Sequence, residues 1–208
     1  MTNDLPGLPP HAFEKDDPSP DRLFYAQPRF VTHIDDHAIA AVTALYRALF
    51  PAGGAVLDLM SSWVSHLPPD VAYAEVIGHG MNEAELKANP RLTRFFVQDL
   101  NENQTLPLAD QSIDAVALCV SVQYLQQPVA VFRELARILK PGGVIAITFS
   151  NRCFPTKAVL IWQALEPGQH DLLVRFYLER AGFPSVETRT LVAPDGPQDP
   201  LWAVIGRR

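Results

Sequence analysis

The sequence lacks the features of membrane and disulfide-stabilised proteins. No stretch approaches the roughly 18 consecutive apolar residues that a membrane-spanning helix needs. Its two cysteines, Cys119 and Cys153, are too few for a disulfide framework. Residues 1–10 contain neither a basic segment nor an apolar run, so they do not resemble a secretory signal. These absences predict a cytoplasmic protein without a membrane partner.

Charge is also scarce. Charged residues make up 19% of the 208 residues, apolar residues make up 48%, and the formal net charge is −6. This net charge argues against nucleic acid as the main partner, because phosphate binding usually needs a basic face. The composition is that of a globular protein, and the length suits one domain with one core.

Prolines are plentiful, with 19 in all, and they gather at the start of the chain. Proline fixes its own backbone and cannot donate a main-chain hydrogen bond, so a proline-rich segment does not form regular structure. The early prolines are Pro6, Pro9, Pro10, Pro18 and Pro20. We therefore expect residues 1–30 to form an extended arm outside the core, and residues 31–208 to form a single domain.

Helical and strand patterns alternate along the rest of the chain. Apolar residues at three- and four-residue steps predict a helix over residues 35–50. Strands are predicted by short apolar runs at 55–60, 73–79, 93–98, 111–120, 144–149, 186–192 and 201–205. Further helices are predicted after Asn82, where Glu85 would complete a capping box, from Pro128, and over 157–165 and 170–181.

This alternation predicts a doubly wound α/β fold, with a mostly parallel sheet and helices on both faces. Ligands of such sheets bind beyond the carboxyl ends of the strands. The sheet edge over residues 186–205 can pair with a second copy, so the oligomeric state stays open between a monomer and a homodimer.

Four segments carry a resemblance to a known family. Leu106–Val116 reads LPLADQSIDAV, and Glu134–Gly143 reads ELARILKPGG. Ser121–Leu125 lies between them, and Val56–Leu59 precedes all three as the first predicted strand. In this order and spacing they resemble the class I S-adenosylmethionine (SAM)-dependent methyltransferases of the type 11 group, a Rossmann-like family.

The resemblance implies a seven-stranded sheet with an antiparallel last strand, and SAM as the cofactor lying across the strand ends. Asp58 would close the first strand. Asp99 would face the adenine amino group, with the backbone of Leu100 beside it. The residues that would flank the methionyl part are Val120, Ser121 and Val122.

The chain departs from the family pattern at both cofactor-binding turns. After the first strand the family has a glycine-rich loop, but here Met60, Ser62 and Val64 stand at the three glycine positions. Glycine at such positions lets the backbone bend tightly and approach a ligand. At the end of the next strand, Gly80 stands where the family places an acid that binds the ribose hydroxyls.

These departures allow two interpretations. In the first, SAM still binds: Ser61 and Ser62 offer hydroxyls and backbone donors to its carboxylate, and Gly78 and Gly80 let the backbone approach the ribose. Further residues expected at the cofactor are Met60, Met81 and Asn82, with Trp63 as an alternative packing residue. In the second, the site has decayed and the chain is a non-catalytic module that binds a ligand or a partner.

A nicotinamide-dependent dehydrogenase fits poorly, because the turn after the first strand contains no G-x-G-x-x-G pattern. Methyl transfer depends mainly on positioning, and a general base is needed only if the acceptor must lose a proton. Residues 24–37 carry aromatic, histidine and acidic side chains. The family resemblance implies that this segment covers the cofactor and shapes the acceptor pocket. Tyr25 and His33 are the predicted catalytic residues. In the alternative interpretation, Tyr25 and Phe30 pack on the sheet edge while Asp35 or Asp36 caps the helix that follows.

Other polar residues have weaker assignments. His33 and His37 stand four apart, a spacing that allows joint metal binding, but no third ligand is evident and no metal is predicted. His66 and Tyr124 are candidates for the acceptor pocket, and Arg152 for binding an acceptor carboxylate. Because little of the chain lies beyond the shared core, the predicted partner is a small-molecule methyl acceptor.

Overall fold

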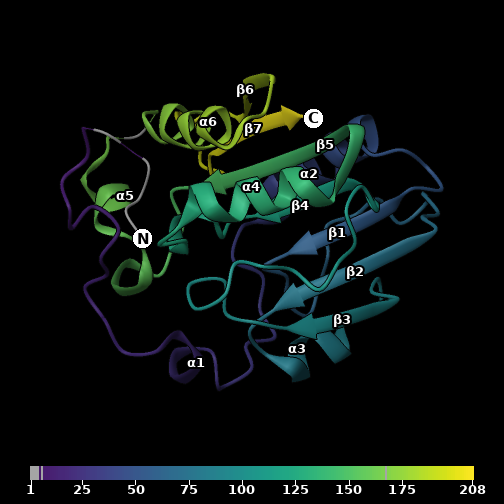
Figure 1. Cartoon of the computed structure of the whole chain (residues 1–208), viewed down its shortest axis with the longest axis horizontal. Helices are drawn as coiled ribbons and strands as arrows, with labels where there is room; N and C mark the ends of the chain where they lie inside the picture. The colour runs from purple at the N-terminus through teal and green to yellow at the C-terminus, as the bar shows by residue number, and fades with distance from the viewer. Residues whose placement is uncertain (1–4, 6, 167) are drawn as a thin grey trace.

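The computed structural model describes residues 5, 7–166 and 168–208, and in these the chain forms one sheet of seven strands. Their order is β3-β2-β1-β4-β5-β7-β6 (Figure 1). The strands are β1 (Ala55–Leu59), β2 (Glu75–Gly80), β3 (Arg94–Val97), β4 (Ile113–Cys119), β5 (Leu139–Ser150), β6 (Ser185–Val192) and β7 (Leu201–Arg207). Only the pairs β5–β7 and β6–β7 are antiparallel. The predicted doubly wound fold, with its antiparallel last strand, is confirmed.

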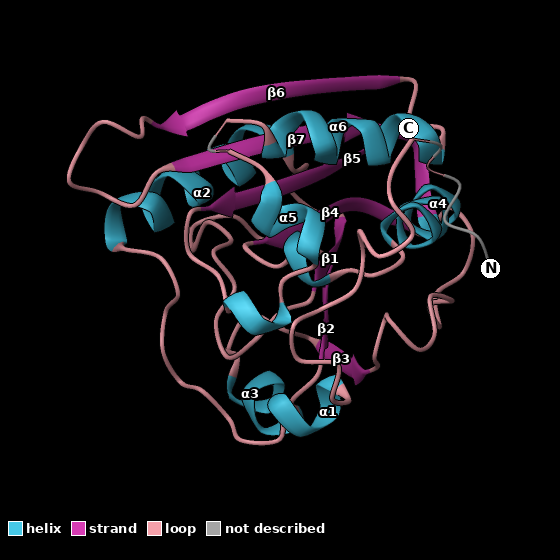
Figure 2. Cartoon of the chain, turned by 90° about the vertical axis from the view of Figure 1, so that its left-hand side faces the viewer, coloured by secondary structure: helices cyan, strands magenta, loops and turns pink. Residues whose placement is uncertain are grey.

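Helices cover both faces of the sheet. They are α1 (Asp21–Phe24), α2 (Asp36–Leu49), α3 (Glu83–Ala88), α4 (Pro128–Ile138), α5 (Leu160–Ala164) and α6 (His170–Ala181), with 3-10 turns η1 (Val122–Tyr124) and η2 (Pro155–Lys157). Helices α4 and α6 share one apolar core with the sheet, and α2 belongs to a second core on the opposite face. Figure 2 shows α2 and α4 on opposite sides of the strands.

Local sequence signals explain the main helices. The Asp35 side chain caps α2 by accepting a 2.8 Å hydrogen bond from the backbone N–H of Ala38. Pro128 occupies the first turn of α4, where its missing N–H has no partner to lose. Gly182 ends α6 in the left-handed conformation. Each of these boundaries agrees with the prediction.

The predicted start of the fifth strand and the predicted sheet edge both need correction. Strand β5 begins at Leu139, because Gly142 takes a left-handed φ of 79° within the strand and its N–H donates to Arg208 O at 2.9 Å. The glycines therefore bend the strand instead of preceding it. Strand β7 lies between β5 and β6, so β6 alone forms this edge of the sheet.

The N-terminal segment packs into the domain, contrary to the expectation that it lies outside the core. Ala12 and Phe13 are buried in the core shared with α4 and α6. Proline prevents regular structure, but it does not prevent burial: Ala12 O accepts from Ile161 N at 2.8 Å. Pro6 and residues 1–4 lie outside the described residues. The domain boundary after residue 30 stays a prediction.

A buried ionic cluster fixes this segment. The Lys157 side chain is fully buried, and its Nζ lies 3.0 Å from Asp17 Oδ2 and 3.4 Å from Asp21 Oδ1. Lys15 Nζ lies 2.5 Å from Asp21 Oδ2. Buried charges are tolerated when each has opposite charges and hydrogen bonds around it. This cluster holds the start of the chain against η2 and brings the following residues over the strand ends.

Among the described residues, no helix combines the length and the apolar character that crossing a membrane requires.

Candidate functional site

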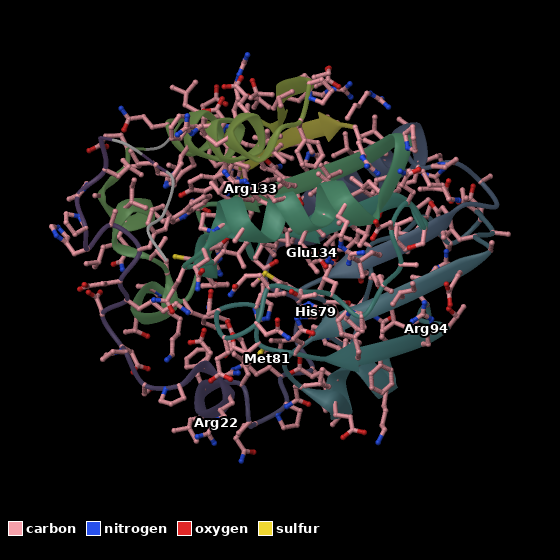
Figure 3. The ribbon with its side chains drawn as sticks, in the orientation of Figure 1. Arg22, His79, Met81, Arg94, Arg133 and Glu134 are labelled. Atoms are coloured by element: carbon pink, nitrogen blue, oxygen red, sulfur yellow. The ribbon has the colours of Figure 1, made fainter. Side chains whose placement is uncertain are left out.

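A cavity of about 480 Å³ opens at the carboxyl ends of β1 to β4, a size typical of small-molecule sites. Its walls come from the loop after β1, the turns after β2, β3, β4 and β5, and the N-terminal segment. Figure 3 shows His79 and Met81 near the arrowhead end of β2, and both residues line the cavity. The position agrees with the predicted location of the ligand site.

Most of the predicted site residues line this cavity: Tyr25, His33, Asp58, Met60, Ser61, Ser62, Gly80, Met81, Asn82, Asp99, Leu100, Val120 and Ser121. Two predicted residues do not. Gly78 faces the side chain of Leu92, which would lie 2.3 Å from an added Cβ. Val122 is buried in the core at the start of η1. Trp63 does not line the cavity either, and its indole N–H donates to Val31 O at 3.0 Å.

The loop after β1 bends without glycine. Met60 adopts a left-handed φ of 55°, a conformation unfavourable for a residue with a side chain. Its backbone N–H donates to His79 Nδ1 at 3.1 Å, and Ser61 N donates to His79 O at 2.6 Å. The expectation that the backbone N–H of Ser61 is available to a ligand carboxylate is therefore wrong, because β2 already uses it.

His79 is the residue that locks this loop, and sequence reasoning did not single it out. Because its Nδ1 accepts from Met60, its Nε2 carries the proton and donates to Gln98 O at 3.0 Å. Burial lowers the pKa of His79 to about 4, so the ring is neutral at physiological pH. The only available signal was a histidine inside a strand pattern, which does not reveal its partners.

The loop after β1 also explains why position 80 is a glycine. A Cβ at this position would lie 2.5 Å from Ser61 O, closer than real Cβ contacts. The backbone of Ser61 thus occupies the space in which the family pattern places an acidic side chain. The altered loop after β1 and the glycine at position 80 are therefore parts of one rearrangement. The loop lies against the end of β2, and the glycine leaves the space that the loop occupies.

Asp58 presents a carboxylate to the cavity. Ser61 Oγ donates to Asp58 Oδ2 at 2.6 Å, and Ser65 Oγ donates to the same oxygen. In the described part of the chain, no hydrogen bond reaches Oδ1. Burial raises the pKa of Asp58 to about 6, although both serine bonds act in the opposite direction. A cationic ligand group would stabilise the charged form of this carboxylate.

Asn82 joins α3 to the N-terminal segment. Its Oδ1 caps the helix by accepting from Ala84 N and Glu85 N at 3.0 and 3.1 Å. Its Nδ2 donates to Tyr25 O at 2.9 Å and to Ala26 O at 3.2 Å. The predicted helix cap is confirmed. Because both ends of the amide are already bonded, the structure gives Asn82 a holding role instead of the predicted ribose contact.

Glu85 does not complete the predicted capping box. Its Oε1 accepts from Arg29 N at 2.6 Å, and its Oε2 accepts from Ser62 Oγ at 2.6 Å. The carboxylate is drawn toward these two cavity-wall donors instead of turning back to the N–H of Asn82. Glu85 therefore connects the N-terminal segment to the loop after β1.

Two buried hydroxyls in the cavity wall have no hydrogen-bond partner among the described residues: Tyr46 Oη and Ser121 Oγ. Tyr46 is 1% exposed and Ser121 is 7% exposed. An unpaired buried polar group costs free energy, so such groups normally find a partner in the protein, in water or in a ligand. Both residues belong to the cavity wall, although the two oxygens themselves are enclosed by neighbouring atoms.

The turn after β3 is braced by a residue that sequence reasoning missed. Asn101 N donates to Asp99 Oδ1 at 2.8 Å, and burial raises the pKa of Asp99. The Asn101 amide donates to Asp21 Oδ2 and to Tyr124 O, both at 3.0 Å. Asn101 therefore ties the Asp99 turn to the N-terminal segment and to the turn after β4.

The two predicted catalytic residues, Tyr25 and His33, lie in the part of the cavity wall that the chain before α2 forms. The ring of His33 packs edge-on against Phe154, with centroids 5.3 Å apart, and burial lowers the pKa of His33 although the residue remains largely exposed. A neutral imidazole can accept a proton. Burial raises the pKa of Tyr25 far above its ordinary value, so its hydroxyl stays protonated and does not suit a general base.

Three of the four weaker candidates from the sequence line the cavity, and one does not. His66 and Arg152 line the cavity, as does Tyr124, whose hydroxyl accepts from Phe154 N at 2.9 Å. His37 does not line it. No group of three or more side chains suited to holding a metal ion occurs among the described residues.

The fold and the site define a class of protein: a Rossmann-like domain with a ligand cavity at the switch point of its sheet. The family model described as a methyltransferase domain matches residues 59–147. A SAM-dependent methyltransferase structure from Mesorhizobium loti is 18% identical, with a TM-score of 0.57, over 81% of this chain and 98% of that one. Residues 59–147 therefore match the methyltransferase-domain family, and the chain has the fold of the SAM-dependent methyltransferases.

Two further similarities are to proteins whose names give different activities. The malonyl-acyl-carrier-protein O-methyltransferase of Marinomonas sp. (strain MWYL1) is 30% identical over 67 residues, or 32% of this chain. The chain's match spans only 25% of that relative's length. The structure of the cyclase SpnF has a TM-score of 0.63 at 15% identity, over 90% of this chain and 91% of that one. The fold alone therefore does not define the reaction.

Proposed function

We propose that the protein is an enzyme that uses SAM to methylate a small molecule. The observation that carries this proposal is the set of unsatisfied polar groups in one cavity at the strand ends. Asp58 Oδ1 and the hydroxyls of Tyr46 and Ser121 all lack hydrogen-bond partners among the described residues. Such groups suit the charged and polar amino-acid end of SAM.

The residues of the cavity fit the cofactor in a definite arrangement. Asp58 would hold the methionyl ammonium, which supplies the positive charge that its buried carboxylate needs. Ser121 would flank the methionyl part, and Asp99 would face the adenine, as the family resemblance implies. The altered loop after β1 then serves as a rigid wall, because His79 fixes its backbone before any ligand arrives.

Methyl transfer from SAM requires little chemical participation by the residues of the chain. Bound SAM supplies a methyl group that its sulfonium already activates, so the residues of the chain mainly orient the acceptor and exclude water. His33, which lines the cavity, would take a proton from an acceptor that must lose one. Tyr25, whose hydroxyl stays protonated, is limited to donating a hydrogen bond or packing on the acceptor.

A non-catalytic module is the alternative, and one observation favours it. The backbone N–H groups of Met60 and Ser61, which face the ligand in a glycine-rich loop, are bonded to His79 here. A protein of this kind would fold with the same cavity but bind SAM weakly or not at all.

Calorimetric titration with SAM, and separately with its product S-adenosylhomocysteine (SAH), separates the two. We expect micromolar binding that is lost in Asp99→Ala and retained in Asp195→Ala, an exposed aspartate in the β6–β7 turn. Circular dichroism checks that both variants are folded. Absence of binding by the folded wild-type protein would contradict the methyltransferase proposal and favour the non-catalytic module.

A further inference from the structure

Arg29 has a distinctive place in the cavity wall. It lies in the N-terminal segment, and its guanidinium carbon sits 4.4 Å from the ring centroid of Phe24 and 5.5 Å from that of Phe154. Nη2 donates to Phe24 O at 2.9 Å. The aromatic faces and this hydrogen bond fix the plane of the guanidinium, so its direction does not depend on a ligand.

This guanidinium has no anionic partner in the described part of the chain. No carboxylate there lies within ion-pair distance of it, and Nη1 is buried without any hydrogen-bond partner. Glu85, the nearest acid by hydrogen bonding, accepts from the backbone N–H of Arg29 and from Ser62, so its two oxygens are engaged elsewhere. The guanidinium of arginine is a cation under physiological conditions. A partly buried cation without an anion is unfavourable unless a ligand supplies one.

The surroundings of Arg29 define the shape of that ligand. Tyr25, Tyr124 and Phe154 line the same cavity, and the rings of Tyr124 and Phe154 stack with centroids 6.0 Å apart. Aromatic walls favour a flat apolar body. A guanidinium favours a carboxylate, to which its N–H groups donate charge-assisted hydrogen bonds.

We propose that Arg29 binds the carboxylate of an aromatic acid, which is the methyl acceptor. The proposal rests on the proposed function, because it assigns the acceptor half of the same cavity. Bound SAM also carries a carboxylate. The contacts of the Arg29 guanidinium are with Phe24, Tyr25 and Phe154, however, and not with Asp58 or Ser121, the groups assigned to the methionyl part.

Benzoate and its neutral isostere benzamide test this assignment when each is titrated into the SAH-saturated protein by NMR. A hydrogen bond to a charged group corresponds to a preference of about 10- to 100-fold for benzoate. We expect wild type to show it and Arg29→Gln to lose it, with SAH affinity unchanged. Arg22→Gln is the matched control, because Arg22 is an exposed arginine of the same segment, outside the cavity (Figure 3).

Three results would overturn the proposal: no preference for benzoate in wild type, an undiminished preference in Arg29→Gln, or a loss of SAH affinity in Arg29→Gln that matches the loss for benzoate. The last would mean that Arg29 binds the carboxylate of the cofactor.

Arg29→Lys keeps the charge and should retain part of the preference for benzoate, so it serves as a control for a folding defect in Arg29→Gln. If wild type does not bind SAH, the proposed function fails, and benzoate titrated into the ligand-free protein still tests Arg29.

Discussion

Replacing Asp58 by asparagine should stabilise the ligand-free protein at neutral pH while removing cofactor binding. Burial raises the pKa of Asp58 from 3.8 to about 6, so the folded state binds this proton more tightly than the unfolded state does. Stability from this group is present below the unfolded pKa and is lost as the pH rises through the folded pKa. Asparagine can still accept the hydrogen bonds of Ser61 and Ser65, but it carries no charge to bury.

The magnitude follows from linkage. A separation of about 2 pKa units corresponds to about 3 kcal/mol at pH 8, and to about 0.5 kcal/mol at pH 4, where the carboxyl is mostly protonated in the folded state. We therefore expect the free energy of unfolding of Asp58→Asn to exceed that of wild type by up to about 3 kcal/mol at pH 8. At pH 4 the difference between the two proteins should nearly vanish.

Urea-induced unfolding of the ligand-free proteins, followed by circular dichroism at both pH values, measures this gap. Asp114→Asn is the matched control on the neighbouring strand. The Asp114 carboxylate accepts from Lys140 Nζ and from Ala55 N, both at 2.8 Å, and its pKa is lowered, so its loss should destabilise the protein at pH 8. If Asp58→Asn were less stable than wild type at pH 8, the carboxylate would be stabilising, and the reasoning about a cationic ligand would fail.

Three further changes probe the loop and the wall. Gly80→Ala places a Cβ against Ser61 O, so we expect a loss of about 1–3 kcal/mol in unfolding free energy, together with weaker SAH binding by calorimetry. A normal melting temperature with full SAH affinity would mean that the loop does not depend on this close approach. His79→Phe leaves Met60 N and Gln98 O without their partner, which should cost about 2–4 kcal/mol at pH 7 in urea unfolding; an unchanged midpoint would refute the locking role. His33→Gln should leave SAH affinity intact but remove an acid limb, below the ordinary histidine pKa of 6.5, from the pH profile of methyl transfer, because burial lowers the pKa of His33. Retention of that limb in His33→Gln would assign it to another group.

The sequence predicted the architecture because the relevant signals are local. Apolar runs located the strands, and Asn82 and Pro128 marked the starts of two helices correctly. The carboxyl ends of parallel strands meet at one edge, so the predicted residues that follow them converge without any knowledge of their contacts. This explains why Asp58, Asp99 and Ser121 were placed correctly in the cavity wall.

The details of the site could not be predicted, because they depend on long-range contacts. The left-handed backbone of Met60 and its bond to His79 join two segments separated by 19 positions, and nothing in either segment alone specifies that pairing. The direction of the Glu85 carboxylate depends on Arg29, which is 56 positions away. Burial of Phe13 depends likewise on distant residues of α6, through its contact with Tyr177.

A crystal structure of the protein with SAH tests the central claim most directly. The account predicts SAH in the cavity at the strand ends, with its amino group beside Asp58 Oδ1, its adenine beside Asp99, and the loop after β1 still bonded to His79. A cavity that stays empty in crystals grown with saturating SAH, or SAH bound elsewhere on the protein, would contradict the claim that this altered site holds the cofactor.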